Sequence, residues 1–393
     1  MNKIIRLLNQ KIILVIGLIF LVILTIYSYQ PAKLSEMSEN HTPKELSNLY
    51  DKSQYVIAKS KNPISDAVFY AHAGYSYVKG SNPILLNAEH PPFGKYLIGL
   101  LFIITSYWKT SGWFFVVTLL ITVNIYLYRK TKSYMPSLLF SFFYVLDTNI
   151  RYQVTGAPLL DIIQLLFLVL YLIYSDKIFS KINQRNLIIS GLILGLLAST
   201  KMYFPAILVF GSTIITLLFK QRFVNLKKYI LILEVPFIAA LVYILTYSVY
   251  FISFHGSPLD FIRSQLWTLH YWTDNAANAN KIFGSLFPLI FFNKYYVWWG
   301  NDPVISYEDW TVMWPISFGL ILLSLFWNLS RFLPKNVLKY STTKYLSISL
   351  LLNIVYFLNI PVSPRYLILL FVPGYIIIAL TTYELLSSKQ KKN

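Results

Sequence analysis

The sequence predicts an all-α polytopic membrane protein, and three observations lead to this fold class. Hydrophobic residues make up 56% of the 393 positions and charged residues only 13%, whereas soluble domains carry about 25% charged residues. The apolar residues occur in blocks of about 20, the length that crosses a bilayer as a helix. Because backbone groups in hydrocarbon must pair within their own segment, and alternating barrel strands are not seen, we expect a helical bundle.

About ten transmembrane helices are expected in a single domain that spans residues 1–393. The first follows a basic N-terminal stretch and has no small-residue cleavage site after it, so we interpret it as an uncleaved span. The short apolar segment Tyr96–Tyr107 is placed as an interfacial or re-entrant helix in the first long loop. The expected spans are 12–29, 112–128, 135–150, 160–175, 187–200, 203–219, 229–254, 311–330, 345–360 and 367–386.

The charge distribution predicts the orientation of these spans. With both termini in the cytoplasm, the cytoplasmic side holds 20 basic residues and only Asp176 and Glu384 as acids, which accounts for the whole net charge of +18. This is the positive-inside bias, and an anionic leaflet explains it without nucleic acid. The loops 30–111 and 255–310 then lie outside. The basic residues are Lys3, Arg6, Lys11, Arg129, Lys130, Lys132, Lys177, Lys181, Arg185, Lys220, Arg222, Lys227, Lys228, Arg331, Lys335, Lys339, Lys344, Lys389, Lys391 and Lys392.

Ionisable residues that interrupt apolar sequence gather at the predicted outer ends of the spans. Charges at membrane depth are costly and usually functional. Their convergence on one face predicts a site that holds an anion and moves a proton. They are Asp66, Glu89, Lys95, Asp147, Arg151, Asp161, Lys201 and Arg365, with Glu234 as the exception nearer the cytoplasmic end.

Asp66 and Glu89 are the two acids of the first long loop. Asp66 follows Asn62-Pro63-Ile64-Ser65, so Ser65 or Asp66 is expected to cap a helix that begins near Ala67. Asp66 is therefore either that helix cap or a general base. Glu89 precedes His90-Pro91-Pro92, where the prolines hold the chain extended. Glu89 is either part of this stiff approach to a helix or a group that binds a metal or orients an acceptor.

Cations near the same face have two interpretations each. Lys95 and Lys201 either meet a lipid phosphate or reach toward the interface as membrane-surface lysines. Arg151 is spaced to pair with Asp147 on one helical face, although it is also a candidate ligand of substrate. Arg365, followed by Tyr366 in an outer turn, suits phosphate because its planar fork binds two oxygens.

The first loop resembles that of the dolichyl-phosphate-mannose–protein mannosyltransferases and the lipid A aminoarabinose transferases, which are GT-C glycosyltransferases. The resemblance rests on Asp66-Ala67 and on the string Glu89-His90-Pro91-Pro92-Phe93-Gly94-Lys95. The family typically has Asp-Glu where this chain has Asp66-Ala67. Beyond about residue 100 the resemblance is confined to isolated positions.

This resemblance implies a GT-C-like bundle and an inverting glycosyltransferase. Such an enzyme moves a sugar from a polyprenyl-phosphate or dolichyl-phosphate carrier in the membrane to a protein, glycan or lipid acceptor outside the cytoplasmic membrane. Asp66 is then the base, and Glu89 and Asp161 shape the site or bind a divalent cation. The candidate substrate-binding residues are His90, Lys95, Arg151, Lys201, Arg365 and Tyr366.

Two other functions stay open at this point. A transporter or flippase of lipid-linked substrates predicts charges near the bilayer midplane, where this chain has few. A non-catalytic membrane assembly factor needs no coordinated acid and cations, and Ala67 is what a decayed active site would show. The sequence contains no cysteine, which excludes thiolate metal sites and cysteine nucleophiles.

Overall fold

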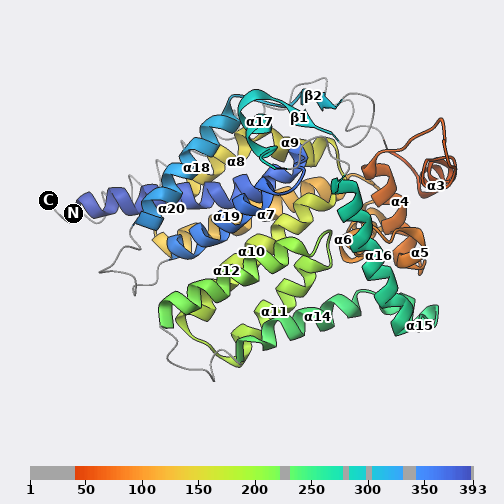
Figure 1. The fold of residues 1–393 in the computed structure, drawn as a ribbon, viewed down its shortest axis with the longest axis horizontal. Coiled ribbons are helices and arrows are strands. Elements are labelled where there is room, and N and C mark those ends of the chain that lie inside the picture. The colour runs from red at the N-terminus through yellow and green to blue at the C-terminus, as the bar shows by residue number, and fades with distance from the viewer. Residues whose placement is uncertain (1–39, 222–230, 278–282, 298–302, 331–341, 391–393) are drawn as a thin grey trace.

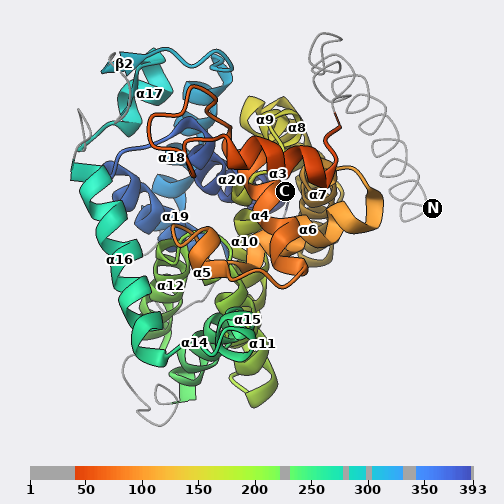
Figure 2. The ribbon, with the colours of Figure 1, turned by 90° about the vertical axis from the view of Figure 1, so that its right-hand side faces the viewer.

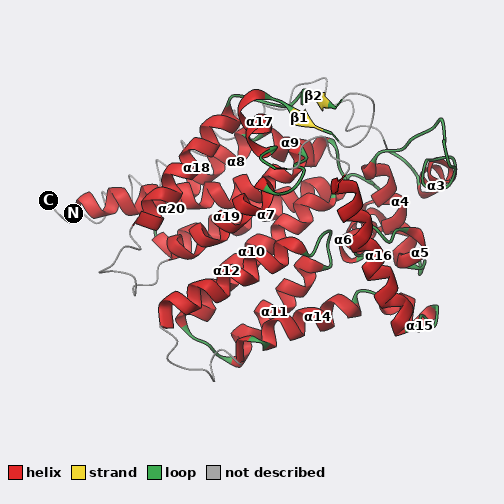
Figure 3. Cartoon of the chain, viewed as in Figure 1, coloured by secondary structure: helices red, strands yellow, loops and turns green. Residues whose placement is uncertain are grey.

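The computed structural model describes residues 40–221, 231–277, 283–297, 303–330 and 342–390, and these residues form helices and one short strand pair (Figures 1 and 3). The helices run in chain order, with the two strands between α17 and α18. They are α3 (Pro43–Asp51), α4 (Asp66–Val78), α5 (Pro83–Leu86), α6 (Phe93–Thr105), α7 (Thr110–Thr131), α8 (Met135–Leu146), α9 (Thr148–Thr155), α10 (Leu160–Ser180), α11 (Gln184–Ala198), α12 (Phe204–Gln221), α14 (Glu234–Leu245), α15 (Ser248–Ser253), α16 (Pro258–Ala277), α17 (Leu286–Phe292), β1 (Tyr295–Tyr296), β2 (Val304–Ile305), α18 (Met313–Ser330), α19 (Thr342–Leu358), η1 (Pro364–Leu367) and α20 (Ile368–Gln390).

The prediction of an all-α polytopic membrane protein is confirmed. Among the described residues, four helical stretches are long and apolar enough to cross a membrane, namely Thr110–Thr131, Leu160–Phe179, Met313–Ser330 and Pro364–Ser388. Six shorter apolar helices accompany them. The stretch that contains α20 is the most enclosed, with 89% of its residues buried, followed by α10 with 67%. These two helices therefore form the centre of the bundle.

Two predicted spans are broken where single helices were expected, and the predicted first span lies outside the described residues. The span 135–150 ends as a helix at Leu146, because Asp147 leaves the helical conformation and its side chain accepts a hydrogen bond from the Asn149 amide to start α9. The span 229–254 divides into α14 and α15. The seven other expected spans each match one helix, to within a few residues at each end.

The ends of the bundle that carry the predicted cytoplasmic residues meet one another. Lys130 at the end of α7 binds Asp176 at the end of α10 at 2.7 Å, and Thr342 at the start of α19 donates to the same carboxylate at 2.7 Å. Asp161 at the other end of α10 is about 22 Å away along the helix axis at 1.5 Å per residue. The Lys130–Asp176 contact and Asp161 thus lie at opposite ends of α10, as the predicted topology requires.

A set of helices from both long loops covers the end of the bundle where Asp161 lies. Figure 2 looks onto this end, with α3, α4 and α6 over the middle and one side and α16 along the opposite edge. The pair α4 and α6 packs without side chains between the backbones at Gly74 and Gly99. A Cβ on Gly74 would collide with the carbonyl of Lys95, and one on Gly99 with the carbonyl of Gly74. The two glycines therefore set how α4, which begins with Asp66, sits on α6.

We expect Gly99→Ala to lower stability, because the added methyl has no space and forces α4 and α6 apart, at a typical overpacking cost of about 1–3 kcal/mol. Thermal unfolding of the purified protein in detergent measures it. Gly319→Ala in α18 is the matched control, since a Cβ there meets nothing within 4 Å. Equal unfolding temperatures for the two variants would contradict the close α4–α6 contact.

The topology prediction is tested with single cysteines in this cysteine-free chain. We expect a cysteine at Lys130 to react with an impermeant thiol reagent only after the cells are permeabilised, because the basic end of the bundle is predicted to be cytoplasmic. A cysteine at the exposed Lys61 is the control that should react in intact cells. Labelling of position 130 from outside would reverse the orientation.

Candidate functional site

Four charged side chains of alternating sign lie in a row at this end of the bundle. Asp66 Oδ2 is 2.7 Å from Arg365 Nη1, and Arg365 Nε is 3.9 Å from Asp161 Oδ2. Asp161 Oδ1 in turn accepts a hydrogen bond from Lys201 Nζ at 2.6 Å. We call these four residues the charged cluster. The sequence predicted that they would share one face, and the structure brings them into direct contact.

Each member of the cluster comes from a different element and stands where that element begins or ends. Ser65 caps α4, because its side chain accepts a hydrogen bond from the Val68 amide, and Asp66 is the first residue of the helix. The alternative in which Asp66 itself caps α4 is therefore wrong. Asp161 lies in the first turn of α10, Lys201 follows the end of α11, and Arg365 lies in η1.

The cluster has a buried half and an accessible half. The side chains of Asp161 and Lys201 are each 1% exposed, whereas those of Arg365 and Asp66 are 21% and 34% exposed. The Lys201 ammonium also lies over the Tyr366 ring, 4.3 Å from its centroid. Because a buried charge without a partner is strongly destabilising, Asp161 and Lys201 hold each other in place. Asp66 and Arg365 are the members that a ligand can reach.

Two buried polar atoms in the cluster make no hydrogen bond to any described residue. They are Asp161 Oδ2 and Arg365 Nε. Buried polar atoms are nearly always paired in folded proteins, so an exception calls for an explanation. The free Nε–H of the guanidinium is a donor that an oxygen of a bound anion can use.

A cavity of about 390 Å³ adjoins the buried half of the cluster. Glu89, Lys201 and Tyr366 are among the residues that line it. The rest of its wall is mostly apolar and includes Met202, Phe204, Leu269, Tyr356, Phe357 and Leu369. Lys201 and Tyr366 therefore belong both to the charged region and to a hydrophobic chamber. This combination suits a ligand with an anionic group at one end and a hydrocarbon chain at the other.

The loop before α6 is fixed from inside by Lys95. This side chain is fully buried, and its ammonium donates to His90 O at 2.8 Å and to Asn87 Oδ1. Both expectations for Lys95, contact with lipid phosphate and extension toward the membrane surface, are therefore wrong in this structure. A buried ammonium needs several acceptors, and two loop oxygens supply them. Lys95 thus holds the loop that carries Glu89 and His90.

Glu89 and His90 sit in different surroundings within this loop. Burial raises the pKa of the Glu89 carboxyl, although a hydrogen bond from Tyr271 opposes the shift. Burial also lowers the pKa of His90 well below its usual range, and Lys201 and Lys95 add to the effect. His90 is therefore neutral, and its ring stacks on Trp272 at 5.1 Å between centroids. The sequence alone does not predict this role of Trp272, because many tryptophans near a membrane only face the interface.

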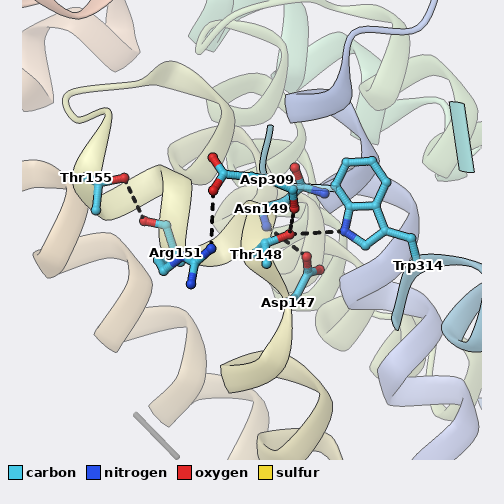
Figure 4. A network of polar contacts seen from close by, with 7 residues as sticks. All are labelled: Asp147, Thr148, Asn149, Arg151, Thr155, Asp309 and Trp314. Atoms are coloured by element: carbon cyan, nitrogen blue, oxygen red, sulfur yellow. Dashed lines mark hydrogen bonds and ion pairs between the residues drawn. The ribbon is translucent and has the colours of Figure 1, made fainter. Parts of the chain in front are cut away.

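Arg151 does not pair with Asp147, contrary to the expectation from their spacing. Figure 4 shows Arg151 reaching Asp309, with Nη2 3.2 Å from Oδ1. The Asp147 carboxylate accepts hydrogen bonds from the Asn149 amide and from Tyr375. Asp147 is the N-cap of α9 and has an extended backbone, so its side chain turns back to the start of the helix and does not take the helical direction that would pair it with Arg151. Thr148 donates to Asp309 O at 2.6 Å. This network attaches α9 to the loop before α18.

Ala67 faces away from the charged cluster. It is buried in a small apolar group with Leu46, Phe102 and Trp108. A carboxylate at this position would lie among these hydrophobic side chains. The departure from the Asp-Glu pattern therefore leaves the arrangement of Asp66 and Arg365 unchanged.

The carboxylates of the site are not arranged as a metal centre. Within the described part of the chain, no three His, Cys, Asp or Glu side chains come close enough together to hold an ion. Asp66 and Asp161 both face Arg365, and Asp161 also binds Lys201. Because Arg365 and Lys201 already lie beside both carboxylates, the described residues do not fit a divalent cation.

Comparisons with known proteins add a distant structural likeness. No protein-family model matches the chain, and no curated protein matches it. One solved structure, an oligosaccharyltransferase from Archaeoglobus fulgidus tethered to an acceptor peptide, aligns with 90% of this chain at 11% identity and a TM-score of 0.42. The chain spans about half the length of that protein. Values this low do not assign an activity.

Proposed function

We propose that this protein is an inverting glycosyltransferase that uses a sugar linked to a polyprenyl phosphate and transfers it to an extracytoplasmic acceptor. The observation that carries the proposal is the contact between the charged cluster and the apolar cavity. A lipid-linked donor needs a hydrophobic place for its chain and cations beside it for its phosphate. Lys201 and Tyr366 stand where these two requirements meet.

The donor phosphate is placed against Arg365 and Lys201. Arg365 has a free Nε–H and is partly accessible, and its planar fork suits two phosphate oxygens. Lys201 borders the cavity and supplies a second positive charge from behind. Fixed cations at the position where negative charge develops lower the barrier of such a transfer. The lipid chain then extends along Phe204, Phe357 and Leu369.

Asp66 is placed as the general base. The acceptor hydroxyl oxygen attacks the anomeric carbon while the bond from that carbon to the phosphate oxygen breaks, which inverts the configuration. The hydroxyl proton passes to the Asp66 carboxylate, and the lipid phosphate leaves with the electron pair. Asp66 is suited to this role because it is the more accessible acid of the cluster. A phosphate that draws Arg365 toward itself also frees Asp66 to take the proton.

Glu89 and His90 are placed on the acceptor side of the donor phosphate. Glu89 borders the cavity, and the buried loop holds it there through Lys95. We propose that it orients the acceptor or the sugar, with neutral His90 behind it. Asp161 acts through its neighbours, because it is buried and positions Lys201 and Arg365.

We expect Asp66→Asn to reduce turnover by about 10²–10⁴-fold, because the amide cannot accept the proton. The assay follows release of polyprenyl phosphate from a panel of polyprenyl-phosphate sugars, with the full-length protein in nanodiscs. Donor binding should be at least as tight as in wild type, because it rests on Arg365, Lys201 and the lipid chain, and the neutral amide competes less for Arg365 than the carboxylate does. The helix is expected to survive, because Ser65 is its cap.

Asp176→Asn is the matched control for this test. It removes an aspartate–lysine bridge at the opposite end of the bundle and should leave turnover near wild type. More than about a tenth of wild-type turnover in Asp66→Asn, which falls short of the smallest loss expected for a general base, would show that Asp66 is not the base. Glu89 would be the next candidate. Loss of turnover in both variants would indicate that any broken bridge is harmful.

We expect Arg365→Gln to weaken donor binding at least about tenfold, or roughly 1.4 kcal/mol, because it removes the accessible cation. Arg365→Lys keeps the charge but loses the planar fork, so its donor affinity should lie between those of wild type and Arg365→Gln. Binding of a fluorescent polyprenyl phosphate to the protein in nanodiscs measures both. Unchanged affinity in Arg365→Gln, in a variant that unfolds at the wild-type temperature, would exclude Arg365 as a phosphate ligand.

A further inference from the structure

Helix α16 is attached to the site along one face. Gln265 accepts a hydrogen bond from Tyr243 at 2.6 Å, and Thr268 donates to Ala88 O at 2.7 Å. Trp272 donates to Glu89 O at 3.0 Å and stacks on His90. These three residues repeat at spacings of three and four, so they lie on one side of the helix. The second long loop thereby holds the loop that carries Glu89.

A second face of α16 is an exposed apolar stripe. Leu259, Ile262, Leu266 and Leu269 are 57%, 54%, 60% and 37% exposed. Their spacings of three, four and three residues place them in a line along the helix. Leu269 also borders the cavity. The stripe therefore runs from the N-terminal end of α16 to the wall of the apolar cavity.

The third face of α16 is exposed and carries most of the charges of the helix, with Trp267, 50% exposed, among them. Asp260 pairs with Arg263 at 3.0 Å, and His270 pairs with Asp274 at 3.1 Å. All four residues are on the side of the stripe that is away from the attached face, as the helical spacing requires. An apolar stripe bordered by a charged face is the pattern of a helix that lies in a membrane interface.

The position of α16 in the fold agrees with this pattern. It runs across the long direction of the bundle helices, at the edge of the end that holds the charged cluster (Figures 1 and 2). The chain reaches it from α14 and α15, which also carry exposed apolar residues, among them Leu241, Leu245 and Ile252. The stripe thus continues the lipid-facing surface of α14 around the corner of the bundle.

We propose that α16 is an interfacial helix whose apolar stripe is inserted into the bilayer at the end of the bundle that holds the charged cluster. Its attached face then ties the Glu89 loop and the cavity mouth to the membrane surface. The charged face remains in water. This inference rests on the membrane fold and on the contacts of α16, and does not depend on the proposed transferase activity.

Depth measurements with single cysteines test the insertion. The full-length protein with Leu266→Cys, Arg263→Cys or Leu323→Cys is labelled with an environment-sensitive fluorophore and placed in nanodiscs. Leu323 is 66% exposed on α18 and serves as the lipid-facing reference. We expect doxyl-labelled lipid to quench the label at 266 within about twofold of the label at 323, and iodide in the water to quench the label at 263. Equal iodide quenching at 266 and 263 would overturn the proposal.

Two further outcomes also decide the matter. A label at 266 that is shielded from both quenchers, with cross-linking between copies, would mean that a second protein chain covers the stripe and would also overturn the proposal. The coupling to the loop is measured by hydrogen exchange of residues 84–92 in nanodiscs. We expect the double variant Ile262→Lys/Leu266→Lys to exchange there at least about threefold faster than wild type, while Arg263→Ala does not, because a charge in the acyl region is expelled. Unchanged exchange in the double variant would show that membrane insertion does not hold the Glu89 loop.

Discussion

The buried ion pair between Asp161 and Lys201 is the constraint on which the rest of this end of the protein depends. Both side chains are almost fully buried, so each requires the other as its partner. The start of α10 and the end of α11 must therefore lie close enough for Lys201 Nζ to stand 2.6 Å from Asp161 Oδ1. Arg365 then lies beside Asp161, and Asp66 beside Arg365. Four elements that are far apart in the sequence are thereby gathered around one electrostatic row. Loss of one partner would leave a buried charge, which is among the most destabilising changes a fold can suffer.

Close backbone contacts bring these elements near enough for the row to form. Gly74 and Gly99 allow α4 to rest on α6, and Gly191 and Gly195 face Val235, Ile238 and Val242 of α14. These glycines permit close packing of α11 against α14. The amide of Phe93 also donates to the carbonyl of Ser199, so the His-Pro-Pro-Phe-Gly string adjoins the turn that presents Lys201. The missing side chains of these glycines allow the helix backbones to approach closely.

Much of this architecture could be predicted from the sequence because hydrophobic length and charge placement are strong signals in a membrane protein. The convergence of Asp66, Asp161, Lys201 and Arg365 could be predicted because ionisable groups at membrane depth are costly and are usually part of a functional site. The partners of Lys95 and Arg151 could not be predicted. A basic residue next to apolar sequence gives the same pattern whether its side chain extends to the membrane surface or binds a nearby loop. The attachment of Trp272 to Glu89 joins residues 183 positions apart, and one sequence carries no signal for such a contact. The end of the helix at Asp147 could not be predicted either, because an acid within an apolar run is found both at buried ion pairs and at helix ends.

The charged cluster contains two carboxylates and two cations, so it is electrically balanced before any ligand arrives. On the proposed reaction a phosphodiester brings one negative charge, while the lipid phosphate that remains carries nearly two at neutral pH. The proton held by Asp66 offsets that increase, and it also cancels the attraction of Asp66 for Arg365. The leaving phosphate is then gripped most firmly just after transfer. On the proposed reaction, release of the lipid phosphate is favoured once Asp66 loses its proton to water and pairs with Arg365 again. The ion pair that stabilises the resting site then also promotes product release.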